Sequence, residues 1–169
     1  MVAACSIRGS GLLRTRVAGR RTARSPVNAP RNGSGGAQGH IVDLSDIGGH
    51  ALTTTLLLQY VGRKSGRTII TPLIYGAIGG EIVIVASKGG ADHHPAWYLN
   101  VRDSKELRFQ IATQAFRATW REPQRAERGT VWYFMVGVFP PYENYQASTN
   151  RQIPLVMLSA IEPIEAFKE

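Results

Sequence analysis

Cations and glycines occur together at two points of the sequence. The first is GRKSGR at 62–67, where Arg63, Lys64 and Arg67 fall in a predicted turn between strands. The second is SKGG at 87–90, at the end of another predicted strand. Arginine offers a planar fork of donors and glycine lets a ligand approach the backbone, so each segment could bind a phosphate or a polycarboxylate. The spacing of a P-loop is absent. A solvated loop at 62–67 is the simpler alternative, and the sequence does not say whether the two segments converge.

Two adjacent histidines, His93 and His94, invite a metal interpretation. Adjacent side chains diverge on a helix or strand, whereas two ligands of one ion on a helix are usually four residues apart. No accompanying set of Cys, His or paired carboxylates is evident, so no metal is expected and the pair is interpreted as a polar helix start. Neither paired catalytic carboxylates nor a Ser-His-Asp arrangement indicates hydrolysis.

Tyr142 and Tyr145 are three residues apart in a short predicted helix, so both rings lie on one face. Their neighbours Glu143, Asn144 and Gln146 are polar, which predicts a half-exposed face. That face could line a pocket for a flat ring system or shield one end of the sheet, and both alternatives stay open.

Six strand-like runs must position these residues. They lie at about 53–61, 67–77, 81–87, 106–112, 115–122 and 153–161. Tight turns at 79–80 and 113–114 predict antiparallel pairing. The runs at 81–87 and 153–161 are apolar on both faces, so each must be covered by a barrel interior on one side and a helix or partner subunit on the other.

Helices are predicted at about 92–102, at 124–139 and directly after Pro140 and Pro141. Pro72 lacks an amide donor, which predicts that it lies at an edge or a bulge of the sheet. We therefore expect an α+β domain built on a small, split barrel of about six antiparallel strands with flanking helices.

The charge is concentrated at the start of the chain. Seven of the 20 Lys and Arg residues lie in residues 1–40, which contain no Asp or Glu. We expect 1–40 to be a basic, disordered tail and 41–169 to be the folded domain. The tail could be a transit peptide, an arm for nucleic acid or an anionic membrane, or the product of a misassigned start codon. The only cysteine, Cys5, is in this tail, and no long apolar run is present, so a cytoplasmic protein is expected.

Three segments together resemble the deazaflavin-dependent nitroreductases, also described as coenzyme F-420-dependent quinone reductases. They are GRKSGRTIITPLIYG at 62–76, VASKGGADHHPAWYLN at 85–100 and PPYENYQASTNRQIPLVML at 140–158. The resemblance extends from about Leu52 to Leu158 in family order. It implies a split barrel similar to that of flavin-binding pyridoxamine phosphate oxidases, with the deazaflavin in a groove beside it. It also implies hydride transfer from the reduced deazaflavin to a quinone-like, nitro or other electrophilic acceptor.

The resemblance also implies roles for individual residues. Arg63, Lys64 and Arg67 would hold the phosphate and the oligoglutamate tail, and Trp97 and Tyr98 would support or contact the cofactor. The complete implied cofactor-binding set is Arg63, Lys64, Ser65, Gly66, Arg67, Thr71, Pro72, Ala86, Ser87, Lys88, Gly89, Gly90, Trp97 and Tyr98. A hydroxyl of Ser87, Tyr142 or Tyr145 could stabilise negative charge on the acceptor oxygen or supply a proton.

Two positions depart from the relative that reduces bicyclic nitroimidazoles. Ile74 and Phe139 stand where that relative has tyrosines, which makes nitroimidazole reduction less expected than cofactor binding. Asn150 replaces an aspartate common in the family.

Other functions compete with this one. FMN in the same barrel, a non-catalytic cofactor-binding protein, and a nucleic-acid or membrane-surface module acting through residues 1–40 are the alternatives. Nucleic acid is not expected to be the main ligand, because the domain itself is nearly neutral. The expected partner is a small-molecule acceptor, and the chain could be a monomer or a homodimer.

Overall fold

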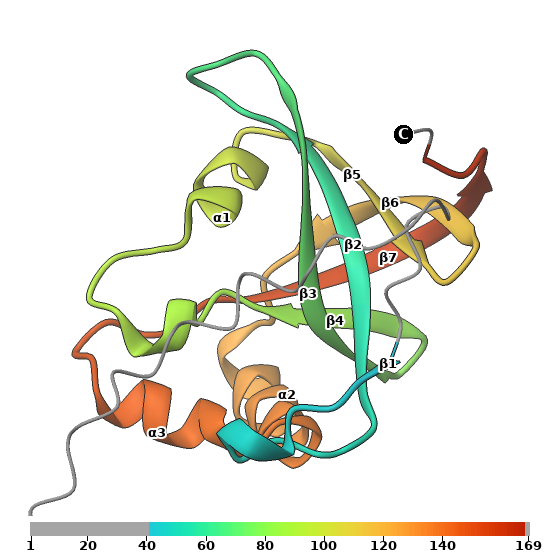
Figure 1. Cartoon of the computed structure of the whole chain (residues 1–169). Helices are drawn as coiled ribbons and strands as arrows, with labels where there is room; N and C mark the ends of the chain where they lie inside the picture. Colours follow the sequence, from blue (N-terminus) through green and yellow to red (C-terminus); the bar gives the residue numbers. More distant parts are fainter. Residues whose placement is uncertain (1–40, 168–169) are drawn as a thin grey trace, which may run out of the picture. The chain divides into compact units, whose positions relative to one another are not determined.

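A computed structural model describes residues 41–167, so the predicted tail at 1–40 lies outside the described residues (Figure 1). The strands are β1 (Ile41–Val42), β2 (Thr53–Val61), β3 (Thr68–Ile78), β4 (Glu81–Val85), β5 (Glu106–Ile111), β6 (Gln114–Arg121) and β7 (Leu155–Ile164). The helices are α1 (Ala96–Val101), α2 (Arg125–Val138) and α3 (Pro141–Ala147), with short 3-10 turns η1 (Ser45–Ile47) and η2 (Lys88–Gly90). All six predicted strands are present, and the prediction missed the short β1 and the 3-10 turns η1 and η2.

The strands form a barrel. They pair in the order β2-β3-β4-β7-β6-β5, and β5 pairs back with β2, so the ring of antiparallel pairings is complete. The closing seam is short, because β2 and β5 pair only from Leu57 with Gln110 to Gln59 with Arg108. This arrangement confirms the predicted α+β class with an antiparallel barrel, although the barrel is more completely closed than the sequence predicted.

Pro72 lies where β3 has a strand on one side only. Along 68–74, β3 pairs with β2, and Pro72 lies opposite Leu57. Pairing with β4 starts at Tyr75, because the chain leaves β4 after Val85 to enter η2. A missing amide donor is tolerated at such an open edge, which confirms the expectation drawn from Pro72. The open edge is the split in this barrel.

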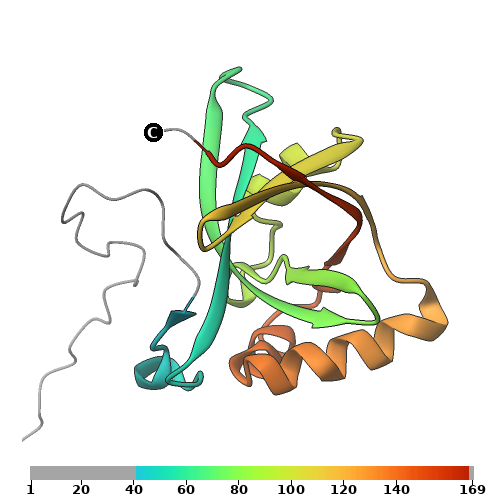
Figure 2. The ribbon, with the colours of Figure 1, turned by 90° about the vertical axis from the view of Figure 1, so that its right-hand side faces the viewer.

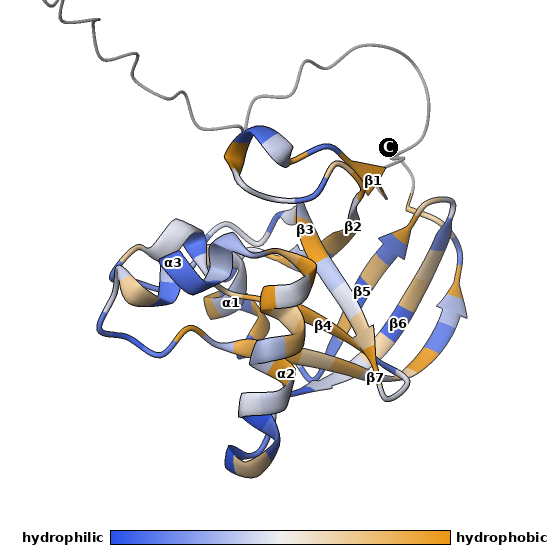
Figure 3. Cartoon of the chain, turned by 90° about the horizontal axis from the view of Figure 1, so that it is seen from below, coloured by the Kyte–Doolittle hydropathy of each residue, from blue (hydrophilic) through white to orange (hydrophobic). Residues whose placement is uncertain are grey.

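Apolar side chains form two cores, one on each face of β4 and β7. Ile84, Val156 and Leu158 fill the barrel interior, whereas Val83 and Met157 face a second cluster. That second cluster is completed by residues of α2 and α3, and Figures 2 and 3 show these helices lying together against one end of the barrel. The two strands with apolar residues on both faces are therefore covered as predicted, by the barrel interior and by helices.

Gly76 of β3 packs against α2, and this gives a first prediction. A Cβ at Gly76 would lie 2.6 Å from Phe134 Cε1 and 2.9 Å from Met135 Sδ. Gly76→Ala should therefore lower the free energy of unfolding by about 1–3 kcal/mol, measured by denaturant titration. Gly137→Ala is the control, because no atom lies within 4 Å of its Cβ position and alanine favours a helix. Equal stability of the two variants would contradict this account of the interface.

Candidate functional site

The two segments with cations and glycines converge on one pocket of about 350 Å³. The loop at 62–67 forms one side, and Lys88 of η2 and the residues leading into α1 form the other. The lining residues are Gly62, Arg63, Lys64, Ser65, Ile69, Lys88, His93, His94, Ala96, Leu99 and Asn100. Three of them are cations and none is a carboxylate, so the lining favours an anionic ligand.

The ammonium group of Lys88 is oriented by two neighbours. Lys88 Nζ donates a hydrogen bond to His93 Nε2, and His93 Nδ1 lies 2.8 Å from Asp92 Oδ1. Because an ammonium group only donates, His93 Nε2 is the acceptor in this hydrogen bond, and Nδ1 faces the carboxylate. The hydrogen bond from His93 in turn lowers the pKa of Asp92. His93 therefore orients a cation at the rim of the pocket.

The loop at 62–67 is tied to α1. The Arg63 amide donates to Asn100 Oδ1 (3.1 Å), and Arg63 Nη1 donates to the Leu99 carbonyl (3.3 Å). Gly66 has a φ of 66° and donates its amide to the Gly62 carbonyl (2.7 Å), which closes the turn. Asn100 is buried and was not predicted. Its only signal in the sequence is an amide side chain at the end of an apolar helix.

Residues 87–90 form a strained corner with free donors. Lys88, Gly89 and Gly90 have φ values of 50°, 63° and 80°, so three consecutive residues are left-handed. For lysine this conformation costs about 1–2 kcal/mol. The backbone amides of Ser87, Lys88 and Gly89 donate no hydrogen bond within residues 41–167. Three unpaired amides beside a lysine make the corner well suited to an anion.

Helix α3 packs directly on this corner. A Cβ at Gly90 would lie 2.8 Å from the Tyr145 carbonyl oxygen and would also meet Ser148 Oγ. Tyr145 is half-buried, whereas Tyr142 is only 3% exposed and contacts the rings of Phe139 and Trp132 at centroid distances of 5.0 and 6.4 Å. Burial raises the pKa of Tyr142, which keeps its hydroxyl protonated. Of the two open interpretations, shielding fits Tyr142. Tyr145 is not among the residues that line the pocket, and its ring contacts those of Phe139 and Tyr142 at centroid distances of 6.2 and 6.3 Å.

Trp97 and Tyr98 lie beneath the pocket instead of in it. Each is 5% exposed and belongs to the barrel core, and Tyr98 Oη donates a hydrogen bond to a Glu122 carboxylate oxygen. Burial raises the pKa of Tyr98. These positions favour the supporting role over direct contact, so both residues fix α1 against the barrel.

The other predicted residues are not among those that line the pocket. Gly66 and Arg67 are exposed in the loop, Thr71 Oγ1 lies 3.2 Å from Tyr60 Oη, and Pro72 is exposed on the open edge of β3. Ala86 is buried, and Ser87 is half-buried at the start of the corner.

His94 is a pocket residue without a predicted role. Its Nδ1 lies 3.3 Å from Arg151 Nη1, and a guanidinium only donates, so His94 is neutral with its proton on Nε2. Burial and the nearby charge of Arg151 lower the pKa of His94, which agrees with this state. Within residues 41–167 no group of three or more His, Cys, Asp or Glu side chains is placed to bind a metal ion. Over the same described range, no helix has the length and apolarity needed to cross a bilayer.

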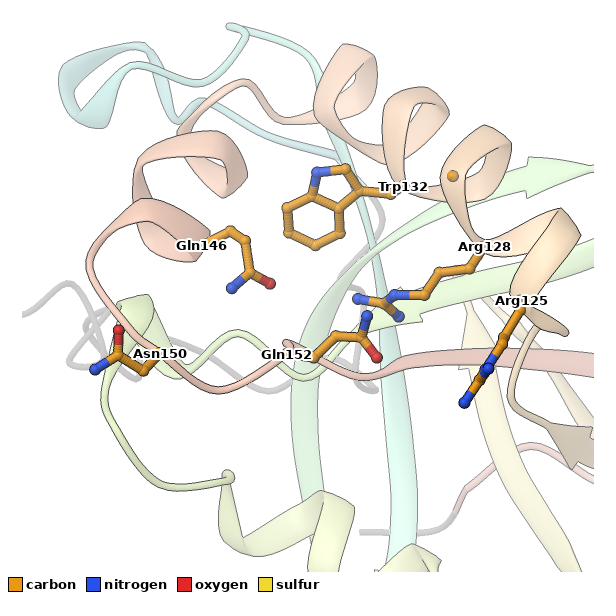
Figure 4. Close-up of a pocket in the computed structure, with 7 residues that line it drawn as sticks. Arg125, Arg128, Trp132, Gln146, Asn150 and Gln152 are labelled. Carbon is orange, nitrogen blue, oxygen red and sulfur yellow. The ribbon is translucent and has the colours of Figure 1, made fainter.

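A second pocket, of about 470 Å³, lies between α2 and the end of α3 (Figure 4). It is lined by Arg125, Arg128, Gly129, Trp132, Gln146, Asn150 and Gln152. Several of its polar groups already have protein partners: Arg128 Nη2 donates to the Ile153 carbonyl (2.7 Å), and the Gln146 amide bonds to two backbone groups. None of the predicted site residues lines it. The first pocket is therefore the candidate site.

The chain is similar to known proteins in sequence and in structure. Residues 37–160 match the sequence profile of the family described as F420H(2)-dependent quinone reductase. The chain is 32% identical over 110 residues to Rv3178 of Mycobacterium tuberculosis, which carries the same family name; the match covers 62% of this chain and 87% of that protein. It is also 32% identical over 108 residues to the F420H(2)-dependent quinone reductase Rv1261c of the same species, covering 62% and 72%.

Solved structures are similar as well. One described as an F420-H2 dependent reductase (FDR-A) has a TM-score of 0.57 and 35% identity, covering 62% of this chain and 93% of that one. Another, described as a domain-swapped dimer, has a TM-score of 0.58 and 35% identity, covering 65% of this chain and 84% of that one.

Proposed function

Since this chain belongs to the F420H(2)-dependent quinone reductase family, we propose that it transfers a hydride from reduced coenzyme F-420 to a quinone. The observation that carries the proposal is the single pocket made jointly by the loop at 62–67 and the corner at 87–90. An FMN-dependent or non-catalytic function is not favoured, because neither explains the family membership.

The pocket suits the anionic part of the coenzyme. Arg63, Lys64 and Lys88 supply positive charge, and the free amides of the corner supply donors for a phosphate or glutamate carboxylate. The exposed Arg67 extends this charge along the loop toward a longer tail. Ser65 and Gly66 complete the turn that carries these cations. We assign Thr71 and Pro72 of β3, together with Ala86 and Ser87 after β4, to the same cofactor groove.

The reduced deazaflavin would supply the hydride, so the chain itself needs to bind, orient and polarise. Negative charge develops on the quinone oxygen as hydride arrives, and a hydroxyl of Tyr145 or Ser87 would stabilise it. Ile74 and Phe139 belong to the apolar cluster that surrounds Tyr142 and Tyr145. An apolar wall at these two positions suits a quinone ring better than a polar nitro group.

The remaining proposals concern the setting of the reaction. We propose that residues 41–169 form a cofactor-binding domain that works in the cytoplasm with a small-molecule acceptor as partner. The basic residues 1–40 would add at most a weak attraction to an anionic membrane surface. Size-exclusion chromatography with light scattering would distinguish a monomer from a homodimer, since one similar structure is described as a domain-swapped dimer.

A turnover assay tests the proposed function. Full-length protein would be mixed anaerobically with reduced coenzyme F-420 and a soluble benzoquinone or naphthoquinone, and the return of the oxidised coenzyme would be followed by its absorbance. We expect oxidation that needs both protein and quinone and saturates with each substrate. Oxidation no faster than without protein would refute the proposal.

Lys88→Ala should weaken coenzyme binding about tenfold, because one charge-assisted hydrogen bond is lost from a partly solvated site. The measurement is an equilibrium titration at two salt concentrations, and the variant should show the smaller dependence on salt. Lys105→Ala is the matched control, because Lys105 is exposed and is not among the residues that line the pocket. Equal affinities of the two variants for the coenzyme would show that Lys88 does not contribute to its binding.

A further inference from the structure

Arg151, in the segment between α3 and β7, binds backbone carbonyls on both sides of the strained corner. Its Nη2 donates to the Ser87 carbonyl at 2.6 Å and to the Ala86 carbonyl at 3.3 Å, and its Nε donates to the Ala91 carbonyl at 2.7 Å. Its Nη1 donates to His94 Nδ1 at 3.3 Å. One half-buried guanidinium therefore fixes the start and the end of the corner, together with a histidine of the pocket.

These bonds determine where the free amides of the corner point. In a trans peptide unit the carbonyl and the next amide point in opposite directions. The Ala86 carbonyl shares its unit with the Ser87 amide, and the Ser87 carbonyl shares its unit with the Lys88 amide. Because both carbonyls turn toward Arg151, both amides turn away from it. The bonds of the guanidinium therefore leave the unpaired amides of Ser87 and Lys88 pointing away from the segment that contains Arg151.

Arg151 has no carboxylate partner to explain its position. No Asp or Glu oxygen within residues 41–167 lies within 4 Å of its guanidinium, and burial lowers its pKa. A partly desolvated cation bound mainly to carbonyls costs free energy relative to a solvated one. The left-handed conformation of Lys88 adds a further cost in free energy. Such strain persists only where the surrounding structure over-determines the backbone conformation. At this corner the surroundings are Arg151 and α3.

We infer that Arg151 is a positioning residue for coenzyme binding, which holds the backbone amides of the corner at 87–90 in the orientation that an anion requires. The inference rests on the proposed function only for the identity of the anion, since the orientation of the amides is a property of the free protein. Arg151 lies in the segment that follows α3. This segment therefore connects the helix that carries Tyr145 to the cofactor corner.

The first test needs no coenzyme. Hydrogen exchange of the Gly90 and Ala91 amides, which bond to the Ser87 and Lys88 carbonyls, would be followed by NMR in wild type, Arg151→Ala and Arg151→Lys. Exchange should be at least tenfold faster in Arg151→Ala than in wild type. The control is Arg128→Ala, which also removes a half-buried guanidinium bonded to one carbonyl but lies in the other pocket. Unchanged exchange in Arg151→Ala, or an equal increase in Arg128→Ala, would overturn the inference.

The second test uses oxidised coenzyme F-420 in an equilibrium titration. Arg151→Ala should raise Kd at least tenfold over Arg128→Ala, and millimolar guanidinium should restore part of the affinity of Arg151→Ala alone. Arg151→Lys keeps the charge without the planar fork, so its Kd should stay well above that of wild type. Full recovery in Arg151→Lys would mean that only charge matters and would overturn the positioning role. If Arg151→Ala does not fold, Arg151→Lys decides between the two roles.

Coenzyme binding by the wild-type protein distinguishes a failure of this inference from a failure of the proposed function. Failure of wild type to bind the coenzyme refutes the proposed function, and the exchange test still decides whether Arg151 holds the corner. Binding by wild type with an unaltered Kd in both Arg151 variants refutes the positioning role alone.

Discussion

Gly90→Ala is expected to raise the Kd for coenzyme F-420 more than a hundredfold. Gly90 has a φ of 80°, which costs alanine about 1–2 kcal/mol. The new Cβ would also lie 2.8 Å from the Tyr145 carbonyl oxygen and 3.0 Å from Tyr145 Cα, which are backbone atoms that cannot rotate away. Either α3 or the corner must move, and both form the proposed site. The measurement is an equilibrium titration combined with thermal unfolding.

Two glycines serve as controls for Gly90→Ala. Gly79 has a φ of 60° in the hairpin between β3 and β4, and Gly89 has a φ of 63° within the corner; neither has an atom within 4 Å of its Cβ position. Gly79→Ala should lower stability and leave Kd unchanged, because only backbone strain is added. Gly89→Ala should give an intermediate Kd. A Gly90→Ala variant that binds as well as Gly79→Ala would contradict the close packing of α3 on the corner.

Tyr145→Phe should lower kcat about a hundredfold and leave the Kd for the coenzyme nearly unchanged. A hydroxyl that donates to a developing negative charge acts in the transition state, and its loss typically costs that much. Tyr145 is chosen because its side chain is half-buried and its backbone lies next to Gly90, whereas the Tyr142 side chain is buried among aromatic rings. The readouts are kcat and KM with a soluble quinone, together with the Kd of the oxidised coenzyme.

Matched tyrosine variants locate this effect. Tyr133→Phe removes the hydroxyl of a residue that is 81% exposed on α2, and it should change neither kcat nor Kd. Tyr142→Phe should have a smaller effect on kcat than Tyr145→Phe, since the Tyr142 ring shields the cluster. If Tyr142→Phe causes the larger loss of kcat, the assignment of the two tyrosines is wrong and must be exchanged.

Local patterns predicted most of the barrel. Leu107 and Phe109 alternate with polar residues in β5 and face the barrel interior. Val83 and Met157 lie on the outer faces of strands that are apolar on both sides, and these faces pack in the second core. Gln110 continues the polar face of β5 and is nevertheless only 4% exposed, because its side-chain amide donates to the Ala112 carbonyl and accepts from the Phe167 amide. A contact with residues far along the chain leaves no trace in the alternation of a single strand.

The candidate site was less predictable. The sequence identified the loop at 62–67 and the corner at 87–90, but not their shared pocket, which depends on how α1 packs against β2. Trp97 and Tyr98 stand in the right motif, yet only the barrel shows that they point inward. Asn100 and Arg151 act through backbone groups of distant segments, so residue type and spacing gave no signal for either.

An equilibrium titration of full-length protein with oxidised coenzyme F-420, followed by its fluorescence, tests the central claim most directly. The account predicts saturable binding of one coenzyme per chain with a micromolar or lower Kd that rises with salt and rises further in Lys88→Ala. Absence of saturable binding, or binding that is insensitive to Lys88→Ala and to Arg63→Ala, would contradict the assignment of this pocket to the coenzyme.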